Sequence, residues 1–304
     1  MKIGYPCINL HLGCRSSSTF RLKSYSAELL REKVAGNLDC LLKILRFNVA
    51  HRILFFRISS DLIPFASHPV CRVDWKRAFR NEFNALGAFI KKHRIRISMH
   101  PDQFTLINSI DPAVFRRSVK ELRYHADVLD AMGLNLSAKI QIHVGGVYGD
   151  REKSIARFVQ RFRALPANVR RRLVIENDDV NYPVADCLEI SHRIGLPVLF
   201  DVFHHTLNNR GEAIRDILPL IAHTWGKRDG IMMVDYSSQE RGKRRRTHAR
   251  TIDLKDFDRF LSLSRPIDFD CMLEIKDKEG SALKAVAAAR RDNRFSNKTR
   301  NTKL

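Results

Sequence analysis

The sequence predicts one α/β domain folded as a single (β/α)8 TIM barrel. Short apolar runs alternate with amphipathic stretches eight times within 304 residues, which is the pattern of parallel strands with covering helices. No Gly-x-Gly-x-x-Gly follows the first apolar run, and this counts against a doubly wound dinucleotide-binding fold. No low-complexity stretch divides the chain into separate domains.

The expected strands are apolar runs rich in β-branched residues, a composition that favours extended structure. In chain order they cover residues 2–8, 53–59, 95–100, 139–144, 173–177, 197–203, 231–236 and 269–275.

The stretches between these runs have helical patterns, for example residues 26–50 and 111–133. The second begins with Asp111 and Pro112, which predicts an N-cap followed by a proline in the first helical position. It ends at Gly133, a residue suited to the left-handed conformation that follows many helices.

The barrel is expected to cover residues 1–289, and the polar, basic residues 290–304 are expected to form a flexible C-terminal tail. The six cysteines are scattered, and none forms a Cys-x-x-Cys pair. We interpret them as free thiols, mostly buried, in a reducing compartment.

The charge balance points to a polyanionic partner. Lys and Arg number 54 against 33 Asp and Glu, so the net charge is 54 − 33 = +21, and the pI is about 10.1. An imbalance of this size favours nucleic acid over a merely soluble basic protein. No stretch approaches the roughly 18 apolar residues of a membrane span, so no membrane partner is expected.

Histidines and carboxylates gather where the expected strands end, which is the catalytic end of such a barrel. A lone histidine there is more often structural, but an unpaired carboxylate in an apolar run is costly to bury. Glu176 and Glu274 each stand in such a run. Consecutive strands deliver one of these residue types at the same end, and this regularity indicates metal ligands. The candidates are His100, His143, Glu176, Asp201, His204, Asp235, His248 and Glu274.

Histidine and carboxylate ligands without cysteine suit Zn²⁺ or Mn²⁺. The candidates exceed the needs of one ion, so a cluster of two or three ions bridged by a carboxylate is expected. Such clusters activate water and clamp the attacking and leaving oxygens of a phosphodiester. With the positive charge, they predict a metal-dependent nuclease whose catalytic residues are Glu176, Glu274 and His143.

Several motifs follow one another in a specific order along the chain. They are GYPCINL, RFN, LFFRISSDLIPFASHP, SMHPDQF, HVGG, IEND, FDVFHH, DYSSQ and LEIKDKE. Together they resemble the ultraviolet-damage endonuclease family, relatives of endonuclease IV, over residues 1–280. The combination of LIPFASHP with MHPDQF is the specific part of this resemblance.

The resemblance implies an endonuclease that nicks damaged double-stranded DNA immediately 5′ of cyclobutane pyrimidine dimers, six-four photoproducts and abasic sites. It implies products with a 3′-hydroxyl and a 5′-phosphate. It also implies two or three divalent ions, manganese first, with Zn²⁺ or Mg²⁺ as alternatives. The ligands that it carries over are His100, His143, Glu176, Asp201, His204, His248 and Glu274, with Glu176 bridging two ions.

The seventh strand departs from the family pattern. Many relatives have Lys-x-His before the Ser-rich turn, whereas this chain has Met233–Val234–Asp235. Asp235 can replace the histidine as an oxygen ligand, but Met233 cannot replace the lysine of relatives, which can be carboxylated. The metal preference and turnover of this chain can therefore differ from theirs.

The SMHPDQF motif places Gln103 and Phe104 directly after the predicted ligand His100. An aromatic ring can stack on exposed bases and an amide can bond to orphaned ones, so we interpret this pair as a lesion probe. Phe104 packed beneath its loop is the alternative. By resemblance, Tyr5 and Asn9 line the pocket for the flipped dinucleotide, and a buried tyrosine with a satisfied hydroxyl is the alternative.

Residues 241–250, RGKRRRTHAR, hold six Lys or Arg. A charged run is usually only a solvated surface, but this one brackets the predicted ligand His248. Phosphate contacts are therefore expected from Lys243, Arg244, Arg245 and Arg246.

Three other functions stay open. A metal-dependent sugar isomerase or epimerase can use the same barrel, although a neutral sugar needs no basic surface. A lesion-binding protein without strong catalysis would fit the altered seventh strand, and an endonuclease acting mainly on abasic sites is a closer alternative. We expect a monomer in the cytoplasm, associated with the nucleoid if the source is bacterial.

Overall fold

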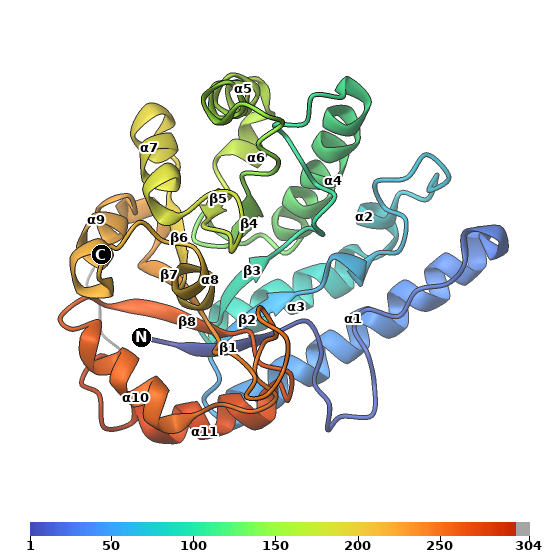
Figure 1. Cartoon of the computed structure of the whole chain (residues 1–304). Coiled ribbons are helices and arrows are strands. Elements are labelled where there is room, and N and C mark those ends of the chain that lie inside the picture. The colour runs from blue at the N-terminus through green and yellow to red at the C-terminus, as the bar shows by residue number, and fades with distance from the viewer. Residues whose placement is uncertain (296–304) are drawn as a thin grey trace.

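The computed structural model describes residues 1–295 and confirms the predicted barrel (Figure 1). Eight parallel strands close in sequence order, with β8 returning to pair with β1. The strands are β1 (Ile3–Pro6), β2 (Phe55–Ile58), β3 (Arg96–Met99), β4 (Lys139–His143), β5 (Leu173–Glu176), β6 (Val198–Asp201), β7 (Met232–Tyr236) and β8 (Phe269–Leu273). Each lies within a range expected from the sequence.

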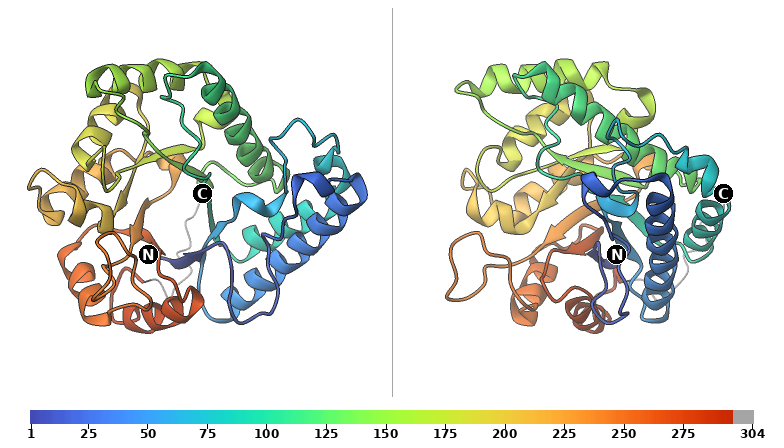
Figure 2. Two further views of the ribbon diagram at one scale, coloured as in Figure 1. Left: turned by 45° about the vertical axis from the view of Figure 1, so that its right-hand side comes forward. Right: turned by 90° about the vertical axis from the view of Figure 1, so that its right-hand side faces the viewer.

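Helices surround the strands as a ring, which the left view of Figure 2 shows along the barrel. They are α1 (Ala27–Ala50), α2 (Trp75–Ala78), α3 (Arg80–Lys92), α4 (Pro112–Ala131), α5 (Arg151–Ala164), α6 (Ala167–Arg170), α7 (Val184–Ile194), α8 (Val202–Leu207), α9 (Ile214–His223), α10 (Leu254–Leu263) and α11 (Glu279–Ala289). Residues 1–295 also contain three 3-10 turns in the connecting segments: η1 (Leu22–Ser24), η2 (Ser60–Leu62) and η3 (Lys227–Asp229). Within residues 1–295, no helix has the length and apolarity that a membrane crossing requires.

The predicted helix ends are confirmed. The Asp111 carboxylate accepts a hydrogen bond from the backbone N–H of Ala113 at the start of α4, and Pro112 is its first residue. Gly133 has a φ of +61° just beyond the end of the same helix.

Alternation along the strands positions the functional site. Because side chains two residues apart share a face of a strand, an apolar residue deep in the barrel is followed by a polar one nearer its mouth. The apolar members form a separate buried cluster of Phe55, Val174, Leu199, Met233 and Met272. Two residues beyond them in sequence stand Arg57, Glu176, Asp201, Asp235 and Glu274.

Gly4 allows the first strand to approach the second. A Cβ built at this position would lie 2.0 Å from the carbonyl oxygen of Phe55, so no larger residue fits without moving β1. Gly4 also pairs with Met272 of β8, and it therefore stands where the barrel closes.

Residues 290–295 pack against the barrel, although a flexible tail was expected to begin at residue 290. Asp292, Arg294 and Phe295 are buried, and the Arg294 guanidinium donates to the carbonyls of Leu261 and Ile267. The basic composition of this segment gave no sign that it packs, because Arg294 is buried with its N–H groups bonded to backbone carbonyl oxygens. The rest of the predicted tail, residues 296–304, lies outside the described residues.

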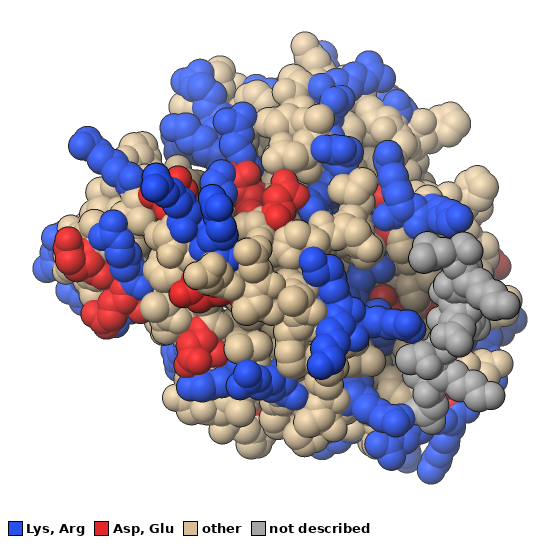
Figure 3. All heavy atoms as spheres, turned by 180° about the vertical axis from the view of Figure 1, so that it is seen from behind, with Lys and Arg blue, Asp and Glu red and all other residues tan. Residues whose placement is uncertain are grey.

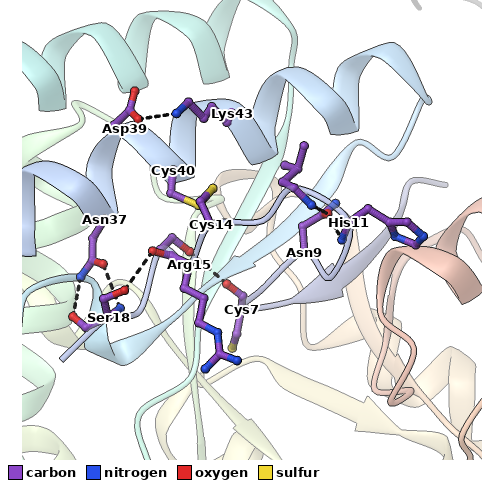
Figure 4. Close-up of a disulfide and its surroundings, with 12 residues drawn as sticks. Cys7, Asn9, His11, Cys14, Arg15, Ser18, Asn37, Asp39, Cys40 and Lys43 are labelled. Carbon is purple, nitrogen blue, oxygen red and sulfur yellow. Dashed lines mark hydrogen bonds and ion pairs between the residues drawn. A yellow bond between two sulfur atoms is a disulfide. The ribbon is translucent and has the colours of Figure 1, made fainter.

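The expectation that all cysteines are free is wrong for two of them. Cys14, in the loop after β1, forms a disulfide with Cys40 of α1, 26 residues away (Figure 4). Their Cα atoms are 5.9 Å apart, within the range that a disulfide spans. The sequence could not indicate this pairing because it depends on how the loop folds back onto the helix. Cys7, Cys71, Cys187 and Cys271 are free.

Candidate metal centre and nucleic-acid rim

The predicted ligands from strands β3 to β8 converge at the mouth of the barrel. They form three groups, and within each group the donor atoms all lie within 4.8 Å of one another. The groups are His100–His143–Glu176, Glu176–Asp201–His204 and Asp201–Asp235–Glu274. Glu176 and Asp201 each belong to two groups, so the arrangement suits a cluster of ions that share bridging carboxylates.

Glu176 lies at the centre of this arrangement and is buried. His100 Nε2 is 3.4 Å from Glu176 Oε2, and His204 Nδ1 is 3.4 Å from Oε1. Burial raises the pKa of the Glu176 carboxyl, but His143, His100 and His204 outweigh burial and hold the pKa well below its usual value. A divalent ion would take the place of the protons that these groups share, because metal ligands must be deprotonated.

Asp201 and His204 owe their proximity to a helix start. Asp201 ends β6 and caps α8, with its Oδ1 accepting from the backbone N–H of His204 at 2.7 Å. The cap leaves Oδ2 facing the His204 ring, with 3.6 Å between Oδ2 and Nδ1. Burial lowers the pKa of His204, but Asp201 and then Glu176 outweigh burial and raise the pKa.

Arg57 is a member of the site that sequence reasoning missed. Its guanidinium is 3% exposed, donates to Asp235 Oδ2 at 2.6 Å and bonds to Glu274 Oε1. Burial raises the pKa of the Glu274 carboxyl, but Arg57 outweighs burial and lowers the pKa to about 2. A charged residue inside the apolar run LFFRI was the available signal, because Arg57 shares the face of Phe55.

Gln141 was also missed and joins two of the carboxylates. Its Nε2 donates to Glu176 Oε2 and to Asp235 Oδ2, both at 2.8 Å. The alternation Lys139–Gln141–His143 in β4 was the signal for this inward position. Gln141 therefore fixes the spacing of the two acids.

In the seventh strand, Met233 lies among apolar residues and Asp235 lies among the predicted ligands. Met233 has no exposed surface and belongs to the apolar cluster within the barrel. Asp235 joins the third ligand group, and Arg57 and Gln141 occupy its Oδ2. Its Oδ1 is buried and has no hydrogen-bond partner within the described part of the chain, so one oxygen is free to bind an ion.

His248 lies beside the cluster and is not in any of the three ligand groups found among residues 1–295. Its Nδ1 is 2.9 Å from the backbone oxygen of Glu274, and its ring centroid is 6.3 Å from that of His204. The contact with the Glu274 carbonyl orients the His248 ring, but the ring lies outside the three ligand groups. Its role as a ligand stays a prediction.

Gln103 and Phe104 form an exposed tip on a firmly held loop. Phe104 is 72% exposed, which rules out the alternative that it packs beneath the loop. The Asp102 carboxylate accepts from the backbone N–H of Phe104 at 2.8 Å, and the Asp102 carbonyl accepts from that of Thr105.

Further along the loop, Arg161 of α5 donates to the carbonyl oxygen of Ile107 at 3.0 Å and to that of Ser109. Arg157, also of α5, donates to the carbonyl of Asn108 at 2.7 Å. The tip therefore extends from a rigid base.

Tyr5 and Asn9 follow the alternative that the sequence left open. Tyr5 has no exposed surface, and its hydroxyl donates to Asn48 Oδ1 at 2.7 Å and accepts from Asn9 Nδ2 at 2.9 Å. Asn9 Oδ1 accepts from the backbone N–H groups of His11 and Leu12, and Figure 4 shows it within this loop. Both side chains hold the loop after β1, so we do not assign them DNA contacts.

The basic run forms a projecting hairpin between β7 and α10, which extends from the body in the right view of Figure 2. Its stem is the bridge between Gln239 and His248. Arg245 donates to the carbonyl of Leu207, and Arg246 pairs with Asp179 at 3.1 Å. Lys243 and Arg244 are exposed, and within the described residues their side chains have no ion pair or hydrogen bond, so both are available for phosphate.

Positive charge is not confined to that hairpin. On the face opposite to the view of Figure 1, Lys and Arg are spread widely, while Asp and Glu gather in a few groups (Figure 3). The net charge of +21 therefore acts as a general field, which draws a polyanion toward the molecule without selecting an orientation.

Comparisons with known proteins agree with the motifs. The family model for UV-endonuclease UvdE matches residues 1–298. The UV DNA damage endonuclease of Clostridium perfringens (strain 13 / Type A) is 36% identical over 299 residues, which cover 98% of this chain and 73% of that protein.

Solved structures add to this agreement. The crystal structure of SacUVDE is 48% identical with a TM-score of 0.91, and the match covers 95% of this chain and 98% of that one. Endonuclease IV from Thermus thermophilus, at 16% identity and a TM-score of 0.55 over 84% of this chain and 95% of its own, shares the fold alone. The chain belongs to the UV-endonuclease UvdE family.

Proposed function

We propose that this chain is a metal-dependent DNA-repair endonuclease that cuts duplex DNA immediately 5′ of ultraviolet photolesions. Cyclobutane pyrimidine dimers and six-four photoproducts are its main substrates, abasic sites are a further class, and the products carry a 3′-hydroxyl and a 5′-phosphate. The observation that carries the proposal is the set of three ligand groups sharing Glu176 and Asp201, in a chain of the UV-endonuclease family.

The donor atoms of these groups fit divalent ions. Buried atoms without a hydrogen-bond partner in residues 1–295 include His100 Nδ1, His143 Nδ1, Asp201 Oδ2 and Asp235 Oδ1. Leaving such atoms unpaired is costly, and ion binding would satisfy the oxygens directly. His100, His143, Glu176, Asp201, His204, Asp235 and Glu274 would hold two or three ions, with Mn²⁺ as our first assignment and Zn²⁺ or Mg²⁺ as alternatives.

When bound, ions of this kind stabilise negative charge on a phosphodiester and activate water for in-line attack. The protein side chains set the geometry for that chemistry. Gln141 holds Glu176 through Oε2, while Arg57 holds Glu274 through Oε1, so the position of each carboxylate is restrained before an ion binds. Glu176, Glu274 and His143 are the residues that we assign to catalysis.

Lesion recognition is assigned to the rim above the cluster. The exposed tip of Gln103 and Phe104 enters the duplex at the damaged step, where the ring stacks on a base that has lost its neighbour. Lys243 and Arg244 bind phosphates, and Arg245 and Arg246 can join them by exchanging their present partners. The monomeric state, the cytoplasmic location and the extended photolesion range stay predictions.

Neighbouring histidines give a sharp test of the cluster. His204 belongs to a ligand group, whereas His205 Nε2 lies 3.0 Å from the carbonyl of Glu212. His204→Asn should lose bound Mn²⁺ and nicking at a thymine dimer while lesion binding survives, and His205→Asn should keep all three. His143→Ala and Glu176→Gln should behave like His204→Asn. If the His204, His143 and Glu176 variants nick normally, the cluster assignment is wrong.

A further inference from the structure

An apolar rim borders one side of the mouth of the barrel. Besides Phe104, the exposed large apolar side chains include Ile110, Tyr148 and Val180, which are 62%, 39% and 54% exposed. They lie on the loops that follow β3, β4 and β5. His100 directly follows β3, and His143 and Glu176 end β4 and β5, so these loops begin at the first ligand group. Gathered exposed apolar residues of this kind mark an interaction surface.

The three loops meet at the backbone of Gly145 and Gly146. Asn108 of the β3 loop donates to the Gly146 carbonyl at 2.8 Å, and Tyr182 of the β5 loop donates to the same oxygen at 2.9 Å. Asn181 donates to the Gly145 carbonyl. A Cβ at Gly145, whose φ is +114°, would lie 2.2 Å from Asn108 Oδ1. The HVGG motif therefore joins the loops into one unit, and the following helices α4 and α5 are neighbours in the ring (Figure 1).

Tyr148 is the aromatic member that this unit presents. Its ring lies over Gly146, where an added Cβ would come within 2.7 Å of the ring. The Arg157 guanidinium lies 5.4 Å from the ring centroid, and Arg157 in turn bonds to the carbonyl of Asn108. The ring is thus supported from within the protein, and its 39% exposure leaves another part of it to solvent.

The backbone of Tyr148 is held in an unfavourable conformation. Its φ is +51°, a region that bulky residues avoid. Strained conformations of this kind persist where the surroundings enforce them, often at binding sites. The Tyr148 hydroxyl forms no hydrogen bond within the part of the chain that the structure describes. Packing against Gly146 and Arg157 accounts for one part of the ring, but not for its exposed part at a position where a glycine would be relaxed.

We propose that Tyr148 is a second aromatic DNA contact, which stacks on a base at the damaged step beside the base engaged by Phe104. This inference rests on the proposed function and deepens it. The exposed cations Lys243 and Arg244 stand on the neighbouring hairpin, whose Arg246 pairs with Asp179 next to Val180, so a duplex would meet bases on the apolar rim and phosphates beside it. Two aromatics on joined loops would hold both faces of the gap that a displaced lesion leaves.

Binding measurements on full-length variants test this inference. Tyr148→Gly removes the ring and relieves the positive φ, so loss of binding could not be assigned to backbone strain. Tyr148→Phe keeps the ring. Affinities are measured in EDTA for a duplex with one thymine dimer and for its undamaged counterpart. Tyr148→Gly should bind the lesion duplex about 5- to 140-fold more weakly, since one base–aromatic stack is lost. Tyr148→Phe should bind like the unaltered chain.

Salt dependence distinguishes stacking from charge. Tyr148→Gly should leave the slope of log K against log salt unchanged, whereas Arg244→Ala should reduce it by about 0.9. Leu220→Ala, which removes a 56% exposed side chain on α9, should change neither quantity. 2-Aminopurine placed opposite the dimer should be quenched by the unaltered chain and by Tyr148→Phe, but less by Tyr148→Gly.

The outcomes separate this inference from the proposed function. If the unaltered chain binds both duplexes equally, the proposed function fails and the inference fails with it. If the unaltered chain prefers the lesion and Tyr148→Gly prefers it equally, only the inference is overturned. If Tyr148→Phe is as weak as Tyr148→Gly, the hydroxyl matters and stacking is not the role of this residue.

Discussion

Replacing Arg57 with methionine tests the polar layer at the mouth of the barrel. The guanidinium is 3% exposed and pairs with Asp235 and Glu274. Removing one partner of a buried ion pair costs about 3–5 kcal/mol, because the remaining charge stays buried without compensation. With roughly 2.1 cal/mol/K of unfolding entropy per residue, this loss lowers Tm by about 5–8 °C in a chain of this length.

The assay is thermal unfolding in EDTA and then in Mn²⁺. The acids freed by Arg57→Met belong to the third ligand group, so Mn²⁺ should bind there and narrow the gap in Tm between the variant and the unaltered chain. Arg96→Met is the matched control. Arg96 is 5% exposed and faces Asp270 at 3.5 Å, but it begins β3, away from the ligands.

Arg96→Met should therefore lose stability in EDTA, and Mn²⁺ should not narrow its gap. If Mn²⁺ narrows the gap in Tm to the unaltered chain equally for both variants, Arg57 does not lie beside ion-binding carboxylates. An Arg57→Met variant as stable in EDTA as the unaltered chain would refute the ion pairs themselves.

Three other perturbations have expected outcomes. Cys14→Ser should lower the stability of the oxidised chain by about 3.5 kcal/mol, since a closed loop of 26 residues restricts the unfolded chain; an unchanged Tm in non-reducing buffer would show that the bond with Cys40 is absent. Burial lowers the pKa of His125 to about 4 from 6.5, so the stability it contributes above pH 6.5 is lost as pH falls toward 4. This loss is about 2 kcal/mol between pH 7 and 5. In the variant His125→Gln, Tm should therefore decrease less as pH falls from 7 to 5. An equally steep decrease in Tm would show that His125 is not its cause. Gln103→Ala with Phe104→Ala should reduce the preference for lesion over intact duplex, and gel-shift titrations that find the preference intact would remove the probe assignment.

The sequence predicted the barrel and most of the site because both depend on regular spacing. The carboxyl ends of all strands lie on the same side of a parallel barrel. The proximity of His100, His143, Glu176 and Asp201 could therefore be predicted from their places at the ends of successive strands. Arg57 and Gln141 stood on the same faces as the ligands and were missed because neither is a common metal-binding residue type.

The remaining errors concern contacts that spacing does not encode. The packing of Arg294 depends on carbonyls of the α10–β8 region, and the Cys14–Cys40 bond depends on the path of one loop. Tyr5 was assigned to a pocket by the resemblance to the family, but Asn48 of α1 supplies the partner that keeps it buried. A single sequence does not show these distant partners.

The measurement that tests the central claim most directly is a nicking assay on an end-labelled duplex with one thymine dimer. Undamaged and abasic duplexes are run beside it, first in EDTA and then with Mn²⁺ restored. The structure and the family predict no cut in EDTA and, with Mn²⁺, a cut immediately 5′ of the dimer that leaves a 3′-hydroxyl. Intact dimer-containing DNA in the presence of Mn²⁺, from a chain that still binds the lesion, would contradict the claim and indicate a binding protein.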